Sequence, residues 1–199
     1  GKNKVAYDFI LDKDNLYTKE GRSLIYYQML GLSLLSLDKT KEFDQLIKKI
    51  SQQKYSKLTH QQKYLSLLKL YREKNYKAVI TGFESLDKST ILTNNSGTRR
   101  VLSDVFYYWR ALSFIKLGQY QNALKETFRF RPVNNQASVG YILDHSWPKK
   151  DYIRGMAYEG LGDKLNAKRS YEDFLRVWKN ADNTLSEIVD AKQRLEKLR

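Results

Sequence analysis

The stretch ALSFIKLGQYQNA at residues 111–123 and the stretch GMAYEGLGDKLNA at residues 155–167 follow one pattern. Each begins with a small residue, places an aromatic residue three positions later, and then carries a Leu-Gly pair and an alanine at the same offsets. Residues three positions apart lie on one face of a helix, and a glycine at a helix end allows the chain to reverse. The pattern predicts a repeated helix-turn-helix.

The same frame continues upstream in two weaker copies. When the first small residue is taken as an anchor, the four anchors are Gly31, Leu67, Ala111 and Gly155. Three positions of each second helix are expected to face the core, and all but Thr127 are apolar or aromatic: Phe43, Ile47 and Ile50; Val79, Phe83 and Leu86; Ala123, Thr127 and Phe130; Ala167, Tyr171 and Phe174. This frame predicts four repeats at about residues 22–51, 59–87, 102–131 and 149–178.

The turn positions differ between the early and late repeats. Asp38 and Lys74 stand where the later repeats have Gly118 and Gly162. Glycine enters the left-handed backbone region without steric cost, whereas residues with a Cβ do not. The first two turns are therefore expected to be looser or differently built.

The remaining segments are assigned from turn and capping signals. Residues 88–97 and 132–148 are rich in turn formers, so the surplus over a regular repeat is expected in loops between repeats and not inside helices. Thr184-Leu185-Ser186-Glu187 is a capping-box pattern, followed by apolar residues at helical spacing. It predicts a closing helix over residues 184–199, and residues 1–18 are interpreted as the remnant of a preceding repeat.

The two strong copies resemble tetratricopeptide repeats. The run Leu117-Gly118-Gln119-Tyr120-Gln121-Asn122-Ala123 matches the family pattern of Leu, a small residue, a Tyr and an Ala. The last copy departs from it where Lys164 replaces the Tyr. The resemblance implies one all-α domain over residues 1–199, a right-handed helical-repeat solenoid of about four helix-turn-helix units plus the closing helix.

The last third of the chain carries a closer likeness. Gly162-Asp163-Lys164, Tyr171-Glu172-Asp173-Phe174-Leu175 and Trp178-Lys179-Asn180-Ala181-Asp182 look like the C-terminal repeat of bacterial tetratricopeptide regions. Such regions are appended to serine/threonine kinases, adenylate cyclases and winged-helix regulators. The resemblance implies protein binding and names no particular partner.

Composition bounds the function classes. The 199 residues carry a net charge of +14 and no cysteine, which excludes disulfides, thiolate metal sites and a cysteine nucleophile. No run of residues is long and apolar enough to span a membrane, and the sequence leaves the compartment open.

No constellation for catalysis is visible. His60 and His145 are the only histidines and are far apart in the sequence, so they form no triad or metal cage. The Ser-x-x-Lys spacing of Ser66 and Lys69 recurs at several other places, which indicates chance in a chain rich in both residues. The sequence therefore predicts a protein that is not an enzyme, with no cofactor and no metal.

A binding groove is predicted on the first helices of the repeats, which line the concave side of a superhelical stack. The residues that flank the anchors mix aromatic and cationic side chains that suit a peptide with a carboxylate: Gln28, Tyr64, Arg72, Tyr108, Trp109, Lys116, Lys149 and Tyr152. Core packing is the alternative reading, because Tyr and Trp at helical spacing are commonly buried.

A basic segment suggests a second kind of partner. Between Lys39 and Lys77 the chain has 11 basic and three acidic residues, with tyrosines interleaved. The basic patch is placed at Lys41, Lys48, Lys49, Lys54 and Lys57. A solvated surface explains it without a ligand, whereas lysines with aromatic residues also suit single-stranded nucleic acid.

The sequence thus predicts a non-enzymatic scaffold whose concave groove binds a peptide or a neighbouring domain of the same chain. One alternative is a regulatory or sensory region of a larger bacterial signalling protein. The other is a basic solenoid that binds nucleic acid or another anionic surface.

Overall fold

The computed structural model describes residues 4–5, 7–8, 10, 23–52, 56–93, 98–129, 149–181, 183 and 185–198. The described residues contain the nine α-helices α3 to α11 and no strand, which confirms the predicted all-α class for this part of the chain. The expected loop at residues 132–148 lies outside the described residues, as do Phe130 and His145. The chain divides into two compact units, Gly1–Asn75 and Tyr76–Arg199.

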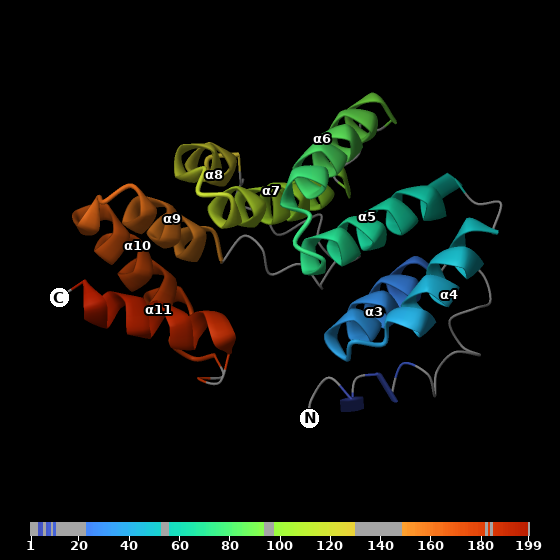
Figure 1. Cartoon of the computed structure of the whole chain (residues 1–199), viewed down its shortest axis with the longest axis horizontal. Helices are drawn as coiled ribbons and strands as arrows, with labels where there is room; N and C mark the ends of the chain where they lie inside the picture. Colours follow the sequence, from blue (N-terminus) through green and yellow to red (C-terminus); the bar gives the residue numbers. More distant parts are fainter. Residues whose placement is uncertain are drawn as a thin grey trace. The chain divides into compact units, whose positions relative to one another are not determined.

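The N-terminal unit contains three helices that pack on one another: α3 (Ser23–Ser36), α4 (Thr40–Ser51) and α5 (Ser56–Arg72) (Figure 1). Its core holds Tyr26, Tyr27, Leu34, Phe43, Leu46, Ile50 and Leu65. The anchor Gly31 allows α3 and α5 to approach closely, because a Cβ there would lie 2.7 Å from Leu65 Cδ2. Residues 4, 5, 7, 8 and 10 are helical, and the Tyr7 ring lies 4.9 Å from Lys39 Nζ.

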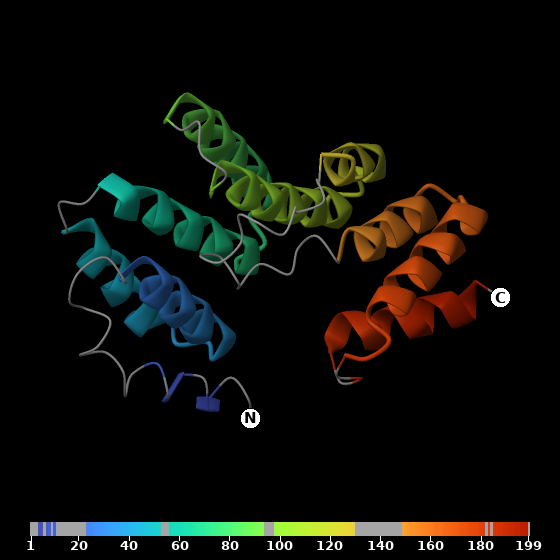
Figure 2. The ribbon, with the colours of Figure 1, turned by 180° about the vertical axis from the view of Figure 1, so that it is seen from behind.

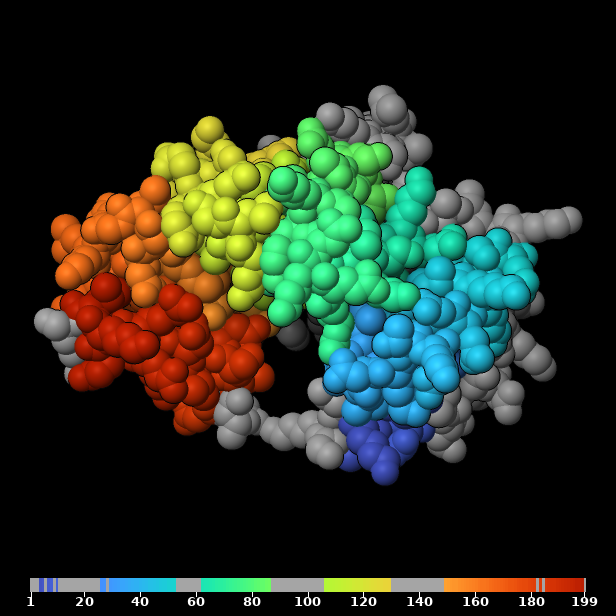
Figure 3. All heavy atoms as spheres, viewed as in Figure 1, coloured from blue at the N-terminus to red at the C-terminus, as the bar shows by residue number. Residues whose placement is uncertain are grey.

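The C-terminal unit contains six helices: α6 (Tyr76–Thr93), α7 (Thr98–Lys116), α8 (Tyr120–Thr127), α9 (Lys150–Gly160), α10 (Lys164–Val177) and α11 (Ser186–Lys197). Each packs on the next in chain order, and α7 also contacts α9 (Figure 2). One core cluster joins Ala111 of α7 to residues of α9, α10 and α11, among them Ile153, Tyr171 and Ile188. Helix α11 packs against α10, and Figure 3 shows the red atoms of this last helix beside the orange atoms of the helices that precede it.

The predicted core positions of the second helices are confirmed for the described residues. Phe43, Val79, Ala123 and Ala167 occupy one position of the frame, and all four are 0% exposed. At the other two positions of the frame, Ile47 is half-buried. The remaining described residues are buried: Ile50, Phe83, Leu86, Thr127, Tyr171 and Phe174. The helical periodicity read from the sequence therefore identifies the buried faces of α4, α6, α8 and α10.

The turns of the four repeats share one backbone geometry, so the expectation that the first two differ is wrong. Asp38 and Lys74 have φ angles of 56° and 62°, and Gly118 and Gly162 have φ angles of 70° and 78°. In each turn the N–H of the following residue donates to the C=O five positions earlier, at 2.9–3.0 Å: Lys39 to Leu34, Asn75 to Leu70, Gln119 to Phe114 and Asp163 to Tyr158. These hydrogen bonds hold the left-handed conformation even where a Cβ makes it unfavourable.

Two other boundaries differ from the sequence expectation. Helix α6 continues to Thr93, so residues 88–93 lie inside a helix and not in a loop between repeats. These residues contain no Gly or Pro that would end the helix before Asn94. The closing helix begins at Ser186 with Leu185 as its N-cap, and Thr184 of the expected capping box lies outside the described residues.

The shared turn geometry predicts opposite effects of substitutions at equivalent positions. Replacing Gly118 or Gly162 by alanine is expected to destabilise the chain by about 1 kcal/mol, because a Cβ costs energy at positive φ. At both positions the added Cβ would meet no described atom within 4 Å, so the cost comes from backbone strain and not from a steric clash. Replacing Lys74 by glycine removes that strain and is expected to stabilise by up to about 1 kcal/mol.

Urea unfolding followed by far-UV circular dichroism measures these changes. Alanine at the exposed, helical Lys125 is the matched control, since it changes no left-handed residue. Loss of stability in Lys74→Gly comparable to that in Gly118→Ala would contradict the account.

Candidate functional site

Four predicted groove residues of the C-terminal unit keep accessible surface on α7 and at the residue before α9. We call Tyr108, Trp109, Lys116 and Lys149 the α7–α9 patch. The rings of Tyr108 and Trp109 meet edge to face with centroids 5.2 Å apart, and both side chains are half-buried. Lys149 Nζ lies 5.9 Å from the centroid of the Tyr108 ring, and Lys116 is exposed at the end of α7. The structure thus places Lys149, the N-cap residue of α9, near an aromatic ring of α7 that is distant in the sequence.

Lys149 also makes an ion pair with the closing helix. Its Nζ donates to Glu187 Oε1 at 2.6 Å, and both side chains are half-buried. Burial alone would raise the pKa of the Glu187 carboxyl, but the hydrogen bond and charge of Lys149 hold that pKa below its ordinary value. The Lys149 side chain therefore contacts both α11 and the Tyr108 ring.

Tyr152 joins a polar network between α9, α10 and α11. Its hydroxyl donates to Asp190 Oδ2 at 2.6 Å, and Arg194 Nε donates to the same oxygen at 2.6 Å. Arg194 Nη1 and the Tyr171 hydroxyl both donate to Glu159 Oε2, at 2.8 and 2.7 Å. Burial and then these carboxylates raise the pKa of both tyrosines, so their hydroxyls remain protonated donors. The network fixes α11 on α9 and α10.

This network separates the predicted groove residues of the C-terminal unit into two groups. Tyr152 is only 9% exposed, and its hydroxyl is occupied by Asp190, so a partner reaches it only if α11 moves. Tyr108, Trp109 and Lys116 keep part of their surface exposed. Burial alone would raise the pKa of Asp190. Its hydrogen bonds to Tyr152 and Arg194, together with the charges of Arg194 and Lys116, lower that pKa below its ordinary value.

The predicted groove residues of the N-terminal unit have different surroundings. Arg72 is exposed; it forms an ion pair with Asp38 and donates to the backbone oxygen of Leu35. These contacts tie α5 to the turn after α3 and give Arg72 a packing role. Tyr64 is half-buried in α5, and Gln28 lies in α3 with a side chain outside the described residues.

The predicted basic patch is only partly described. Lys41, Lys48 and Lys49 are exposed on α4. Lys54 lies outside the described residues, and Lys57 belongs to α5 with a side chain that is not described.

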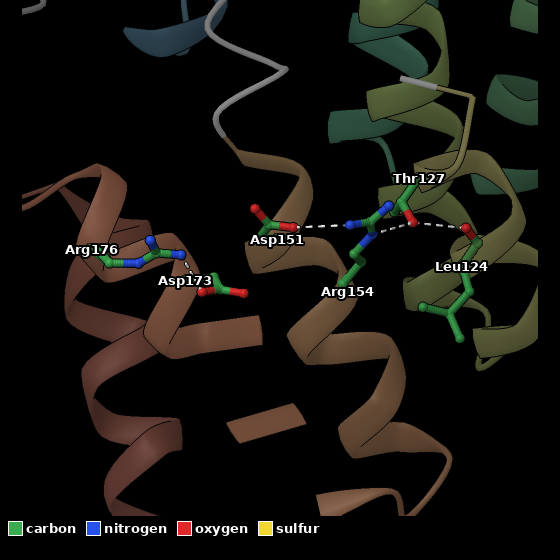
Figure 4. Close-up of polar contacts among 6 residues, drawn as sticks. All are labelled: Leu124, Thr127, Asp151, Arg154, Asp173 and Arg176. Atoms are coloured by element: carbon green, nitrogen blue, oxygen red, sulfur yellow. Dashed lines mark hydrogen bonds and ion pairs between the residues drawn. The ribbon is translucent and has the colours of Figure 1, made fainter. Parts of the chain in front are cut away.

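Thr127, the one polar residue in the predicted core frame, has a hydrogen-bonding role. Its hydroxyl donates to the backbone oxygen of Leu124 at 2.8 Å and accepts from Arg154 Nε at 3.1 Å. Figure 4 shows Arg154 of α9 between Thr127 and Asp151, whose Oδ1 lies 3.2 Å from Arg154 Nη1. The guanidinium also lies 4.9 Å from the Phe128 ring centroid. These contacts link α8 to α9 and explain a buried hydroxyl that sequence reasoning left unexplained.

A buried ion pair lies between α7 and α8. Arg110 Nη2 is 3.0 Å from Glu126 Oε1, and each side chain is 8% exposed. Arg129 Nη1 approaches the other carboxylate oxygen at 3.6 Å, and its guanidinium lies 4.3 Å from the Tyr107 ring centroid. The spacing of Asp190 and Arg194 at i and i+4 is a sequence signal for their pairing. No such signal marks Arg110 with Glu126, or Lys149 with Glu187, because tertiary packing alone brings them together.

The described residues contain no group of three or more His, Cys, Asp or Glu side chains that could hold a metal ion. In the same part of the chain, no helix has the length and apolar character needed to cross a membrane. Comparisons with known protein families, with curated proteins and with solved structures find no match to this chain.

Proposed function

We propose that the chain is a non-enzymatic protein-binding module whose contact surface is the α7–α9 patch. The observation that carries the proposal is the pair of half-buried aromatic rings of Tyr108 and Trp109, which touch each other on a packed helical frame. Tyr and Trp anchors of this kind supply much of the binding energy of protein interfaces, because they bury a large area at low entropic cost. The repeat frame acts as the scaffold that presents them.

A tetratricopeptide-like architecture is part of the same proposal. The four turns with one left-handed geometry and the four fully buried second-helix positions support a tetratricopeptide-like helical-repeat solenoid. A module of this type serves as a scaffold or as the regulatory region of a larger signalling protein, and both uses need a partner surface.

The chemistry of the patch favours a peptide that combines an apolar or aromatic side chain with a carboxylate. The rings offer area for stacking and apolar burial, and the exposed Lys116 offers a charge for the carboxylate. Lys149 is paired with Glu187, and Asp190 with Arg194, so neither pair adds net charge to the patch.

Selection of peptides from a random display library against the full chain tests the proposal. We expect selected peptides to contain aromatic and acidic residues, and Trp109→Ala to weaken their binding at least 10-fold, as hot-spot truncations do. Lys116→Gln should weaken the binding of peptides that carry a carboxylate and leave the binding of their neutral analogues unchanged.

Phe128→Ala is the matched control, because it removes an exposed aromatic ring at the end of α8, outside the patch. Circular dichroism of each variant establishes that the fold is retained. Selection without any binder, or binding that Trp109→Ala leaves unchanged, would overturn the proposal.

A further inference from the structure

A second surface on the N-terminal unit is independent of the α7–α9 patch. Helix α4 and the residue that follows it expose one face that carries three lysines and two glutamines and no acidic residue; we call this face the basic stripe: Lys41, Gln45, Lys48, Lys49 and Gln52. These positions recur at four, seven, eight and eleven residues from the first, which places them on one side of the helix. At about 1.5 Å per residue the stripe is about 16 Å long.

The two acidic residues beside the stripe form ion pairs with lysines outside it. Glu42 lies 3.3 Å from Lys39 Nζ, and the pKa of its carboxyl is lowered by a backbone hydrogen bond and by Lys39. Asp44 accepts a hydrogen bond of 2.6 Å from Lys69 Nζ, which raises the pKa of that lysine. Lys41, Lys48 and Lys49 form no ion pair with any residue that the structure describes. These three lysines therefore keep exposed side chains, and only the charge of Lys41 also acts on Glu42, where it helps to lower the pKa of that carboxyl.

The other face of α4 argues against a membrane as the anionic partner. Phe43, Leu46 and Ile50 of that face are buried in the core of the N-terminal unit. The helix thus has no apolar side left to enter a bilayer, as a helix that lies in a membrane interface requires. The stripe also lacks the aromatic or apolar anchor that protein interfaces use.

We propose that the basic stripe of α4 binds the phosphodiester backbone of a nucleic acid without reading its sequence. Phosphates of a polyanion can pair with the three ammonium groups, which lie within residues 41–49 of one helix face, and the glutamine amides add neutral donors to phosphate oxygens. Lysine acts as a point charge and not as a bidentate fork, so it suits backbone contact more than base recognition. The net charge of +14 steers a polyanion towards the chain.

The test uses the full chain with short fluorescein-labelled RNA and DNA oligonucleotides, and measures fluorescence anisotropy between about 50 and 200 mM salt. We expect binding at low salt that weakens as salt rises. The combined variant Lys41→Gln, Lys48→Gln and Lys49→Gln should lower affinity at least 10-fold and reduce the slope of log K against log salt by about 2, at about 0.7 per lost phosphate contact. RNA and DNA measured side by side show which backbone is preferred.

The matched control removes three exposed lysines of the C-terminal unit, as Lys164→Gln, Lys168→Gln and Lys179→Gln. It lowers the net charge equally, so a specific stripe predicts near-normal binding in this variant. Equal loss in both variants would overturn the proposal and leave only net-charge attraction. A chain that binds neither RNA nor DNA at low salt would also overturn the proposal. This holds even if the chain binds vesicles of acidic phospholipid and the stripe variant loses that binding.

Discussion

Replacing Glu126 by alanine is expected to destabilise the C-terminal unit by about 3–5 kcal/mol, the usual cost of removing one partner of a buried ion pair. Arg110 places a guanidinium cation in the interior, where its side chain is 8% exposed. Its Nε and Nη1 atoms are buried and have no hydrogen-bond partner in the described part of the chain, so Glu126 is the group that compensates this guanidinium. Without Glu126 the whole charge would be left uncompensated.

Tryptophan fluorescence during urea unfolding measures this effect in the correct unit. The three tryptophans, Trp109, Trp147 and Trp178, all lie in the C-terminal unit, so their signal reports its unfolding alone. Far-UV circular dichroism on the same samples reports both units and shows whether they unfold together.

A double variant separates the loss of the pair from the loss of packing. Arg110→Met with Glu126→Leu replaces both charges by apolar groups of similar volume, and is expected to be as stable as the parent chain or more stable. Arg129 would lose its contact with Glu126, but it is largely exposed and this contributes little. A double variant less stable than Glu126→Ala would show that the ion pair is itself the source of stability.

Much of the helical frame could be predicted because it depends on local signals. The burial of Phe43, Val79, Ala123 and Ala167 follows from helical periodicity and the anchor spacing. The conformation of Asp38 and Lys74 could not be predicted from residue type, because hydrogen bonds and packing on both sides of each turn outweigh a strain of about 1 kcal/mol.

The candidate site shows the same limit at longer range. Tyr108 and Trp109 are adjacent in the sequence, and their place on the first helix of a repeat follows from the frame. Lys149 and Glu187 are 38 residues apart, as are Tyr152 and Asp190, so their contacts depend on where the closing helix packs. The helical frame alone predicts Tyr152 in an open groove, because it carries no signal for the polar contacts between α9 and α11.

Replacing the anchor Gly155 by alanine is expected to destabilise the C-terminal unit by about 2 kcal/mol. The added Cβ would overlap Cε1 of Tyr171 and lie 2.5 Å from its Cδ1. The Tyr171 ring is 0% exposed, packs against the Tyr152 ring and is tethered through its hydroxyl to Glu159, so it cannot swing aside. Overpacking costs about 3 kcal/mol, and the better helix propensity of alanine offsets about 1 kcal/mol of it.

A double-mutant cycle distinguishes this collision from a general effect on the helix. In a Tyr171→Leu background the ring is absent, so Gly155→Ala should be neutral or stabilise by up to about 1 kcal/mol through helix propensity. Gly31→Ala, at the same anchor of the first repeat, meets the terminal methyl groups of Leu65 and should cost less, because those groups can rotate. If Gly155→Ala costs the same with and without the Tyr171 ring, the glycine is required for another reason than the close approach of α9 to α10.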